Sequence, residues 1–136
     1  YSYRQVTSLI KILKFLVKKY KIKNTNILGH SDISPNRKKD PGEKFPWKKL
    51  SNHNLVKWHN LNQIELKKNR LKKLSLIEEH RFLKCLNILG YNKVKSLKSI
   101  KGNKFLIKAF QRRFRQNLIN GIADKECLLI VKNLLN

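Results

Sequence analysis

The spacing of apolar and polar positions predicts a helix at the start of the chain. Between Tyr3 and Tyr20, apolar residues recur at steps of three and four with lysines between them, which is the pattern of an amphipathic helix. A short apolar run, 26–30, follows and ends on His30. Its length and composition predict a buried strand. A helix leading into such a strand indicates an α/β layer, in which the helix covers a sheet whose other strands precede Tyr1.

The segment 31–46 interrupts this regular pattern, because it contains three prolines and a glycine. We expect it to form a long, shaped loop, and long loops in compact domains are usually functional. A short helical turn at 47–50 closes it. Residues 53–76 are polar and rich in lysine, with Trp58 as the large apolar anchor, and we interpret them as a connector.

Three further helices are predicted in the second half of the chain, at 78–89, 103–115 and 124–135. Gly90 is placed to end the first of them, and Asp124 is placed to cap the last. The chain therefore divides into residues 1–52, a partial α/β domain made of a helix, a buried strand and a long loop; the connector 53–76; and residues 77–136, a small all-α three-helix bundle.

The formal net charge is +24, from 32 Lys plus Arg against 8 Asp plus Glu. Such a charge attracts polyanions, either nucleic acid or an anionic cell envelope. The basic residues are spread along the chain, which is also rich in Asn and Ile, so the codon bias of an A+T-rich genome explains much of the charge equally well. Cys85 and Cys127 match no metal or redox pattern and are expected to be free thiols. No apolar run reaches the length of about 20 residues that a transmembrane helix needs.

An imidazole and a carboxylate are ten residues apart on the predicted loop. His30 ends the expected strand, and Asp40 follows across a proline-stiffened segment, with Lys38 two residues before it. Histidine and aspartate are both good zinc ligands, and a catalytic zinc site needs three protein ligands and an open position. Spacing alone leaves other interpretations open: a packed histidine, an Asp-Pro-Gly turn and a solvated basic run.

The block GHSDISPNRKKDPG at 29–42, with FPW at 45–47, resembles the second half of the type 2 N-acetylmuramoyl-L-alanine amidases. That family shares its fold with the peptidoglycan-recognition proteins. The resemblance implies a mixed sheet flanked by helices, and one zinc ion held by two histidines and one aspartate. It also implies hydrolysis of the amide that joins N-acetylmuramic acid to L-alanine.

Individual roles follow from the same resemblance. His30 matches the second histidine ligand, Asp40 the aspartate ligand, and Lys38 the lysine that stabilises the developing oxyanion. Arg37 matches a position near the peptide stem of the substrate in some members. Asp32 also fits the motif, as a group that orients the loop or a metal ligand without binding the metal ion itself.

The motif is incomplete in this chain. The family's first histidine ligand and its catalytic glutamate precede the region present, and the chain opens on Tyr1 and contains no Met. We therefore expect a C-terminal fragment that is inactive alone. His53, His59 and His80 lie outside the motif and are weak candidates for a third ligand.

A second resemblance concerns the C-terminal half. IKAFQRRFR at 107–115 and NGIAD at 120–124 are similar to the three-helix peptidoglycan-binding domain. Phe110 and Phe114 are expected to fill its core, while Gln111 and Arg112 face outward. In a plain helical bundle, the arginines of this helix would only be solvated.

The sequence thus predicts a zinc-dependent amidase fragment that acts on peptidoglycan or muropeptides in the cell envelope or periplasm. One alternative is a peptidoglycan-binding protein without catalysis. A basic nucleic-acid-binding protein is a third hypothesis, which the dispersed charge disfavours. The oligomeric state stays open.

Overall fold

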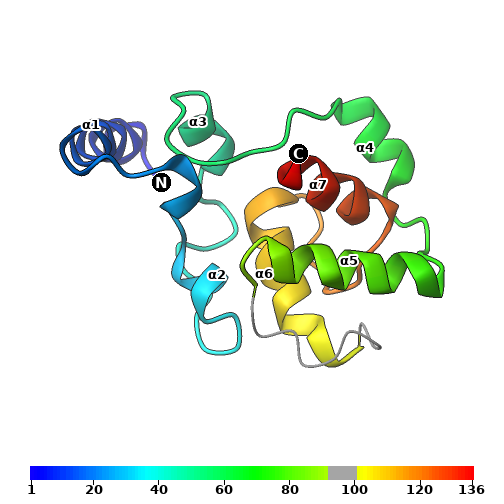
Figure 1. The fold of residues 1–136 in the computed structure, drawn as a ribbon. Helices are drawn as coiled ribbons and strands as arrows, with labels where there is room; N and C mark the ends of the chain where they lie inside the picture. The colour runs from blue at the N-terminus through cyan, green and yellow to red at the C-terminus, as the bar shows by residue number, and fades with distance from the viewer. Residues whose placement is uncertain (92–100) are drawn as a thin grey trace.

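The structure, a computed structural model, describes residues 1–91 and 101–136, and within those ranges it contains helices and loops but no β-strand (Figure 1). Residues 92–100, which fall inside the predicted unit 77–136, lie outside the described residues. The α-helices are α1 (Tyr3–Tyr20), α2 (His30–Ile33), α3 (Trp47–Ser51), α4 (Gln63–Asn69), α5 (Leu76–Ile88), α6 (Lys104–Phe114) and α7 (Lys125–Leu135). Two 3-10 turns, η1 (Asn24–Asn26) and η2 (Lys101–Asn103), precede α2 and α6.

The predicted α/β fold and the buried strand at 26–30 are wrong. The backbone is extended at Ile27, with φ −94° and ψ 106°, and at Gly29, with φ −90° and ψ 158°. A strand also needs a hydrogen-bonded neighbour, and none pairs with this run among the described residues. Leu28 is 48 % exposed, and His30 already begins α2. The apolar run therefore predicted extended backbone correctly and a sheet incorrectly.

Helix α1 occupies the range that its periodicity predicts. A reciprocal capping box between Ser2 and Gln5 starts it, and Lys21 ends it in the left-handed conformation. These contacts satisfy backbone groups that the helix itself leaves unpaired at its ends. Val6 and Ile10 pack into an N-terminal cluster that also contains Trp47, Leu50, Leu55 and Val56. One face of α1 is thereby fixed against α3 and the loop that precedes it.

Helices α5, α6 and α7 also lie where the sequence predicts helices, and they form the larger, C-terminal cluster. A capping box of Ser75 and Glu78 starts α5, and the Asp124 side chain accepts a hydrogen bond from the Cys127 amide at the start of α7. Helix α4 lies within the predicted connector 53–76, and its Leu66 belongs to the same cluster. The proposed division into domains stays a prediction.

The expectation that Gln111 and Arg112 face outward is wrong. Gln111 is fully buried, where it accepts a hydrogen bond from the Gly121 amide at 2.8 Å and donates to the Ile122 carbonyl at 2.8 Å. Arg112 is 6 % exposed. The physical reason is that α6 has neighbours on more than one side, since α2 packs against it in addition to the C-terminal cluster.

A buried ionic network joins α4, α6 and α7. Arg115 donates to Asp124 at 2.5 Å and lies 3.4 Å from the nearer carboxylate oxygen of Glu126. Arg70 binds both oxygens of Glu126 at 2.7 Å. The Asp124 carboxylate also accepts from the Leu71 amide at 3.0 Å, so the residue that caps α7 holds the segment before α5 as well.

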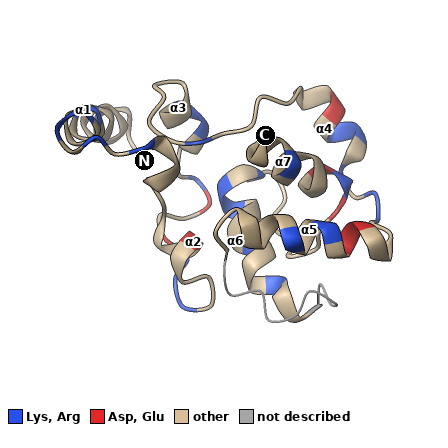
Figure 2. Cartoon of the chain, in the orientation of Figure 1, with Lys and Arg blue, Asp and Glu red and all other residues tan. Residues whose placement is uncertain are grey.

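Charge and thiols are as the sequence indicates. Lys and Arg occur on most of the described helices and on the loop after α2 (Figure 2). Cys127 is buried, Cys85 is half-buried, and both are free thiols. Burial raises the pKa of Cys127 to about 12. None of the described helices combines the length and apolarity that crossing a membrane requires.

We predict that Arg115→Met lowers the free energy of unfolding by about 3–5 kcal/mol, because it removes the only cationic partner of the buried Asp124 carboxylate among the described residues and one of the two cationic partners of Glu126. Urea unfolding followed by circular dichroism measures the change. Arg81→Met on the exposed face of α5 is the matched control, with an expected change within about 0.5 kcal/mol. Equal effects of the two substitutions would contradict a structural role for the network.

Candidate functional site

The structure brings His30 and Asp40 together. The Nδ1 atom of His30 forms a hydrogen bond with the Oδ2 atom of Asp40, although the residues are ten positions apart. Their side chains are 74 % and 55 % exposed, so both remain accessible from solvent. Beside them, the Ser31 amide donates to the Asp40 carbonyl at 2.9 Å. This backbone hydrogen bond joins the end of the loop to the start of α2.

Close packing at Gly29 holds the same two segments together. A Cβ atom added to Gly29 would lie 2.7 Å from Cδ of Pro41 and 3.2 Å from the Trp47 ring. Real Cβ atoms do not approach that closely, so a glycine is required here for steric reasons. The Tyr1 hydroxyl donates to the Pro41 carbonyl on the other side of the loop. Asp40 is thus positioned by its neighbour Pro41.

Asp32 is buried behind this pair and binds three donors. Its carboxylate accepts from the Gly29 amide at 2.9 Å, from the Tyr91 hydroxyl at 2.7 Å and from Arg113 at 2.7 Å. Arg113 also donates to the Ile27 carbonyl at 3.0 Å. Burial, followed by the Asp32 charge, raises the pKa of Tyr91, so its hydroxyl stays a donor. The predicted role of Asp32 in orienting the loop remains a proposal, for which these contacts provide a physical basis.

Helix α6 contacts the far end of the loop as well. The guanidinium of Arg113 lies over the Trp47 ring, 4.4 Å from its centre, and Gln116 donates to the Phe45 carbonyl at 2.7 Å. Sequence analysis missed Tyr91, Arg113 and Gln116 as residues of the site. The signal in the sequence was the run of polar residues on the otherwise apolar helix α6. That run can be interpreted only once the contact between α6 and α2 is known.

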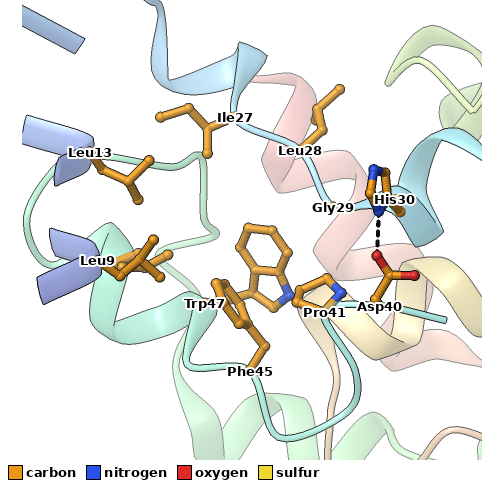
Figure 3. A pocket seen from close by; sticks show the side chains of 11 residues that line it. Leu9, Leu13, Ile27, Leu28, Gly29, His30, Asp40, Pro41, Phe45 and Trp47 are labelled. Carbon is orange, nitrogen blue, oxygen red and sulfur yellow. Dashed lines mark hydrogen bonds and ion pairs between the residues drawn. The ribbon is translucent and has the colours of Figure 1, made fainter. Parts of the chain in front are cut away.

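A pocket of about 270 Å³ lies next to the His30–Asp40 pair. Figure 3 shows the pair on one side of the pocket, Leu9 and Leu13 of α1 on the opposite side, and Trp47 between them. The remaining walls are apolar, formed by Ile27, Leu28, Gly29, Pro41, Phe45 and Leu50. The polar atoms at this site are therefore concentrated at one rim of an apolar recess.

The electrostatic surroundings favour the charged form of Asp40. Its hydrogen bond with His30 is the largest of the influences that lower its pKa, and the positive charge of Lys38 acts in the same direction. A carboxylate must be ionised to bind a metal ion. The site thus keeps this side chain in the state that a cation requires.

Lys38 and Arg37 lie on the exposed outer side of the same loop. Arg37 donates to the Ser34 hydroxyl at 3.2 Å. Both residues line a second recess, between the loop and α6, rather than the pocket beside His30. The structure therefore separates these two basic residues from the apolar pocket but keeps them on the loop that carries Asp40.

The other histidines do not complete a ligand set with His30 and Asp40. His53 is exposed after α3, and His80 is on α5. His59 is buried, stacks on Trp58, and has its pKa lowered by burial. Across residues 1–91 and 101–136, no group of three or more His, Cys, Asp or Glu is arranged to hold a metal ion.

Comparison with known proteins points to one enzyme family. Residues 1–43 match the family model of N-acetylmuramoyl-L-alanine amidases. The N-acetylmuramoyl-L-alanine amidase AmiD of Escherichia coli strain K12 is 33 % identical over 131 residues, which cover 96 % of this chain and 47 % of that protein. The N-terminal part of the chain is thus similar to an amidase domain of this type.

Solved structures give the same result for the fold. The complex of E. coli AmiD with anhydro-N-acetylmuramic acid-L-Ala-D-γ-Glu-L-Lys matches with a TM-score of 0.80 and 31 % identity, covering 96 % of this chain and 51 % of that one. AmpDh3 of Pseudomonas aeruginosa in complex with an anhydromuramic pentapeptide matches with a TM-score of 0.79 and 25 % identity, covering 98 % and 52 %. The chain therefore spans about half the length of the proteins that it resembles.

We predict that Gly29→Ala separates Asp40 from His30, because the new methyl group displaces Pro41. Overpacking of this kind lowers the free energy of unfolding by about 1–3 kcal/mol. Nuclear magnetic resonance of the His30 ring detects loss of the hydrogen bond, and urea unfolding measures stability. Gly102→Ala is the control, since no atom lies within 4 Å of its added Cβ. An unchanged His30 spectrum in Gly29→Ala would refute the steric argument.

Proposed function

We propose that this chain forms part of the active site of a zinc-dependent N-acetylmuramoyl-L-alanine amidase, which cleaves the amide between N-acetylmuramic acid and L-alanine in peptidoglycan. The observation that carries the proposal is the contact between His30 and Asp40 at the exposed rim of a pocket. Similarity to E. coli AmiD over 96 % of the chain supports it. Because the chain spans about half of that relative, activity of the whole protein is part of the proposal.

The two side chains fit zinc chemically. Imidazole nitrogen and carboxylate oxygen are both common zinc ligands, and here they converge within hydrogen-bonding distance while remaining open to solvent. They supply two of the three protein ligands that a catalytic zinc site needs. The described residues provide no third, so we propose that the remaining ligand comes from outside them.

When bound, zinc supplies Lewis-acid polarisation of a carbonyl group and lowers the pKa of water. The residues of this chain have complementary roles in the proposal. Lys38 places a positive charge where negative charge develops on the amide oxygen. Arg37 binds the peptide stem. Asp32, through Gly29 and Arg113, keeps His30 in the position from which it can bind the metal ion.

Peptidoglycan fragments are the proposed ligands. The similar solved structures are complexes with anhydromuramyl peptides, and this supports the same class of ligand here. A location in the cell envelope belongs to the same proposal. The C-terminal helices are proposed to bind the polymer, on the basis of the motif at 107–124. Within that motif, Gln111 is used for internal hydrogen bonds, so any ligand contact must come from other residues.

We predict that this chain alone binds zinc weakly and hydrolyses no muropeptide, because two ligands do not complete the site. A fusion that joins the part of E. coli AmiD outside the matched region to Tyr1 of this chain should bind one zinc ion tightly. The same fusion should hydrolyse N-acetylmuramoyl-L-Ala-D-γ-Glu-L-Lys. Calorimetry measures zinc binding, and chromatography of the released peptide measures hydrolysis.

Point variants of the fusion separate the proposed roles. His30→Ala and Asp40→Ala should abolish tight zinc binding. Lys38→Met should retain zinc and lower the rate about a hundredfold or more, as expected for loss of an oxyanion-stabilising group. Lys84→Met on α5 is the matched control for loss of a basic charge. A folded fusion that binds no zinc would refute the catalytic proposal and favour a binding protein.

A further inference from the structure

A basic groove of about 240 Å³ lies between the loop that follows α2 and the exposed side of α6. The loop contributes Arg37, Lys38 and Lys39, and α6 contributes Lys108 and Arg112. Glu43 is the acidic residue of the lining, and the remaining positions are Pro35, Asn36, Phe105 and Ile119. This groove is separate from the apolar pocket beside His30, although residues of one loop line both.

Arg112 is the unusual residue of the groove. It is 6 % exposed, and its Nε and Nη1 atoms have no hydrogen-bond partner among the described residues. Oε1 of Glu43 lies 4.0 Å from Nε, which is beyond hydrogen-bonding distance. Burying charged donors without partners is destabilising. The neighbouring Arg113 and Arg115 each also have an Nε atom without a partner among the described residues, but their Nη1 atoms bind carboxylates at 2.7 and 2.5 Å.

The charge and shape of the groove define a ligand. Five cationic side chains against one carboxylate favour an anion, and a guanidinium binds a carboxylate through two parallel hydrogen bonds. Phe105 and Ile119 add apolar surface on the α6 side. A ligand that carries both a carboxylate and alkyl groups uses both features, whereas inorganic phosphate uses only the charge.

We propose that this groove binds a free carboxylate of a short peptide, with Arg112 and Lys108 of α6 as its principal contacts. The inference deepens the proposed function, since the peptide would be the stem of the muropeptide. The compound in the AmiD complex contains a γ-linked glutamate, and that linkage leaves the α-carboxylate free. Asp40, at the rim of the first pocket, belongs to the same loop as the residues Arg37, Lys38 and Lys39 that line the groove.

The test titrates this chain, without zinc, with the tripeptide L-Ala-D-γ-Glu-L-Lys. Its matched probe is the same tripeptide with both free carboxylates converted to carboxamides. Shifts of backbone amide resonances at Gly42 and Lys108 report binding. We expect saturable binding of the tripeptide with free carboxylates, and about tenfold weaker binding of the carboxamide, as loss of a charge-assisted hydrogen bond predicts.

Three variants test the contacts. Lys108→Gln and Arg112→Lys should each weaken tripeptide binding about fivefold to tenfold, and Arg112→Lys keeps the charge in case larger changes unfold α6. Glu43→Gln should strengthen binding, because it removes the carboxylate that lies closest to Arg112 Nε in the groove. Lys18→Gln, on the exposed side of α1, controls for the general effect of a net charge of +24.

The outcomes separate this inference from the proposed function. The tripeptide has no muramyl amide, so its binding does not depend on zinc or on hydrolysis. Equal weakening by Lys108→Gln and Lys18→Gln would overturn the inference, as would weaker binding to Glu43→Gln. Inorganic phosphate that competes for the groove as strongly as the tripeptide would also overturn it, since a general anion site has no preference for a peptide.

Discussion

The buried carboxylate of Asp32 joins the N-terminal segment that carries the candidate site to the C-terminal helices. It accepts from Gly29, Tyr91 and Arg113, and these donors come from the segment before α2, from the end of α5 and from α6. Burying a charge is unfavourable unless its hydrogen-bonding capacity is satisfied, and here three donors satisfy it. Contacts within that segment, such as the Ser31–Asp40 backbone bond, join the loop to α2, whereas the Asp32 carboxylate joins the segment to the C-terminal helices. The C-terminal helices therefore organise the candidate site in the N-terminal segment.

Helix α6 thus presents functional arginines on two of its sides. Arg113 faces Trp47 and the backbone before His30, whereas Arg112 faces the basic groove. The chain has 8 acidic residues, and six of them (Asp32, Asp40, Glu43, Glu78, Asp124 and Glu126) lie within 4.0 Å of a basic side chain. Scarce negative charge is thus used mainly in specific pairs that join separate segments, which leaves the remaining positive charge on the surface and in the groove.

Periodicity predicted most helices because a helix with one buried face carries its own signal, as α1, α5 and α7 show. Two errors arose where burial depends on a partner distant in the sequence. The run 26–30 has extended backbone but no strand beside it among the described residues. The composition of the run alone does not show whether a neighbouring strand exists. Gln111 and Arg112 are polar, yet α2 and the turn before α7 cover them. For the site, the motif identified His30 and Asp40, whereas Arg113 and Tyr91 required the fold.

Contacts within the chain hold His30 and Asp40 close to each other. The Ser31–Asp40 backbone bond, the contact of Gly29 with Pro41 and the Asp32 network hold both donors in place. In such an arrangement, folding has already restricted the conformational freedom of the two ligand side chains, so metal binding does not have to restrict it again. A third ligand added to a preorganised pair then binds zinc at a high effective concentration. Under the proposed function, the C-terminal helices therefore affect metal affinity through α6, although they supply no metal ligand themselves.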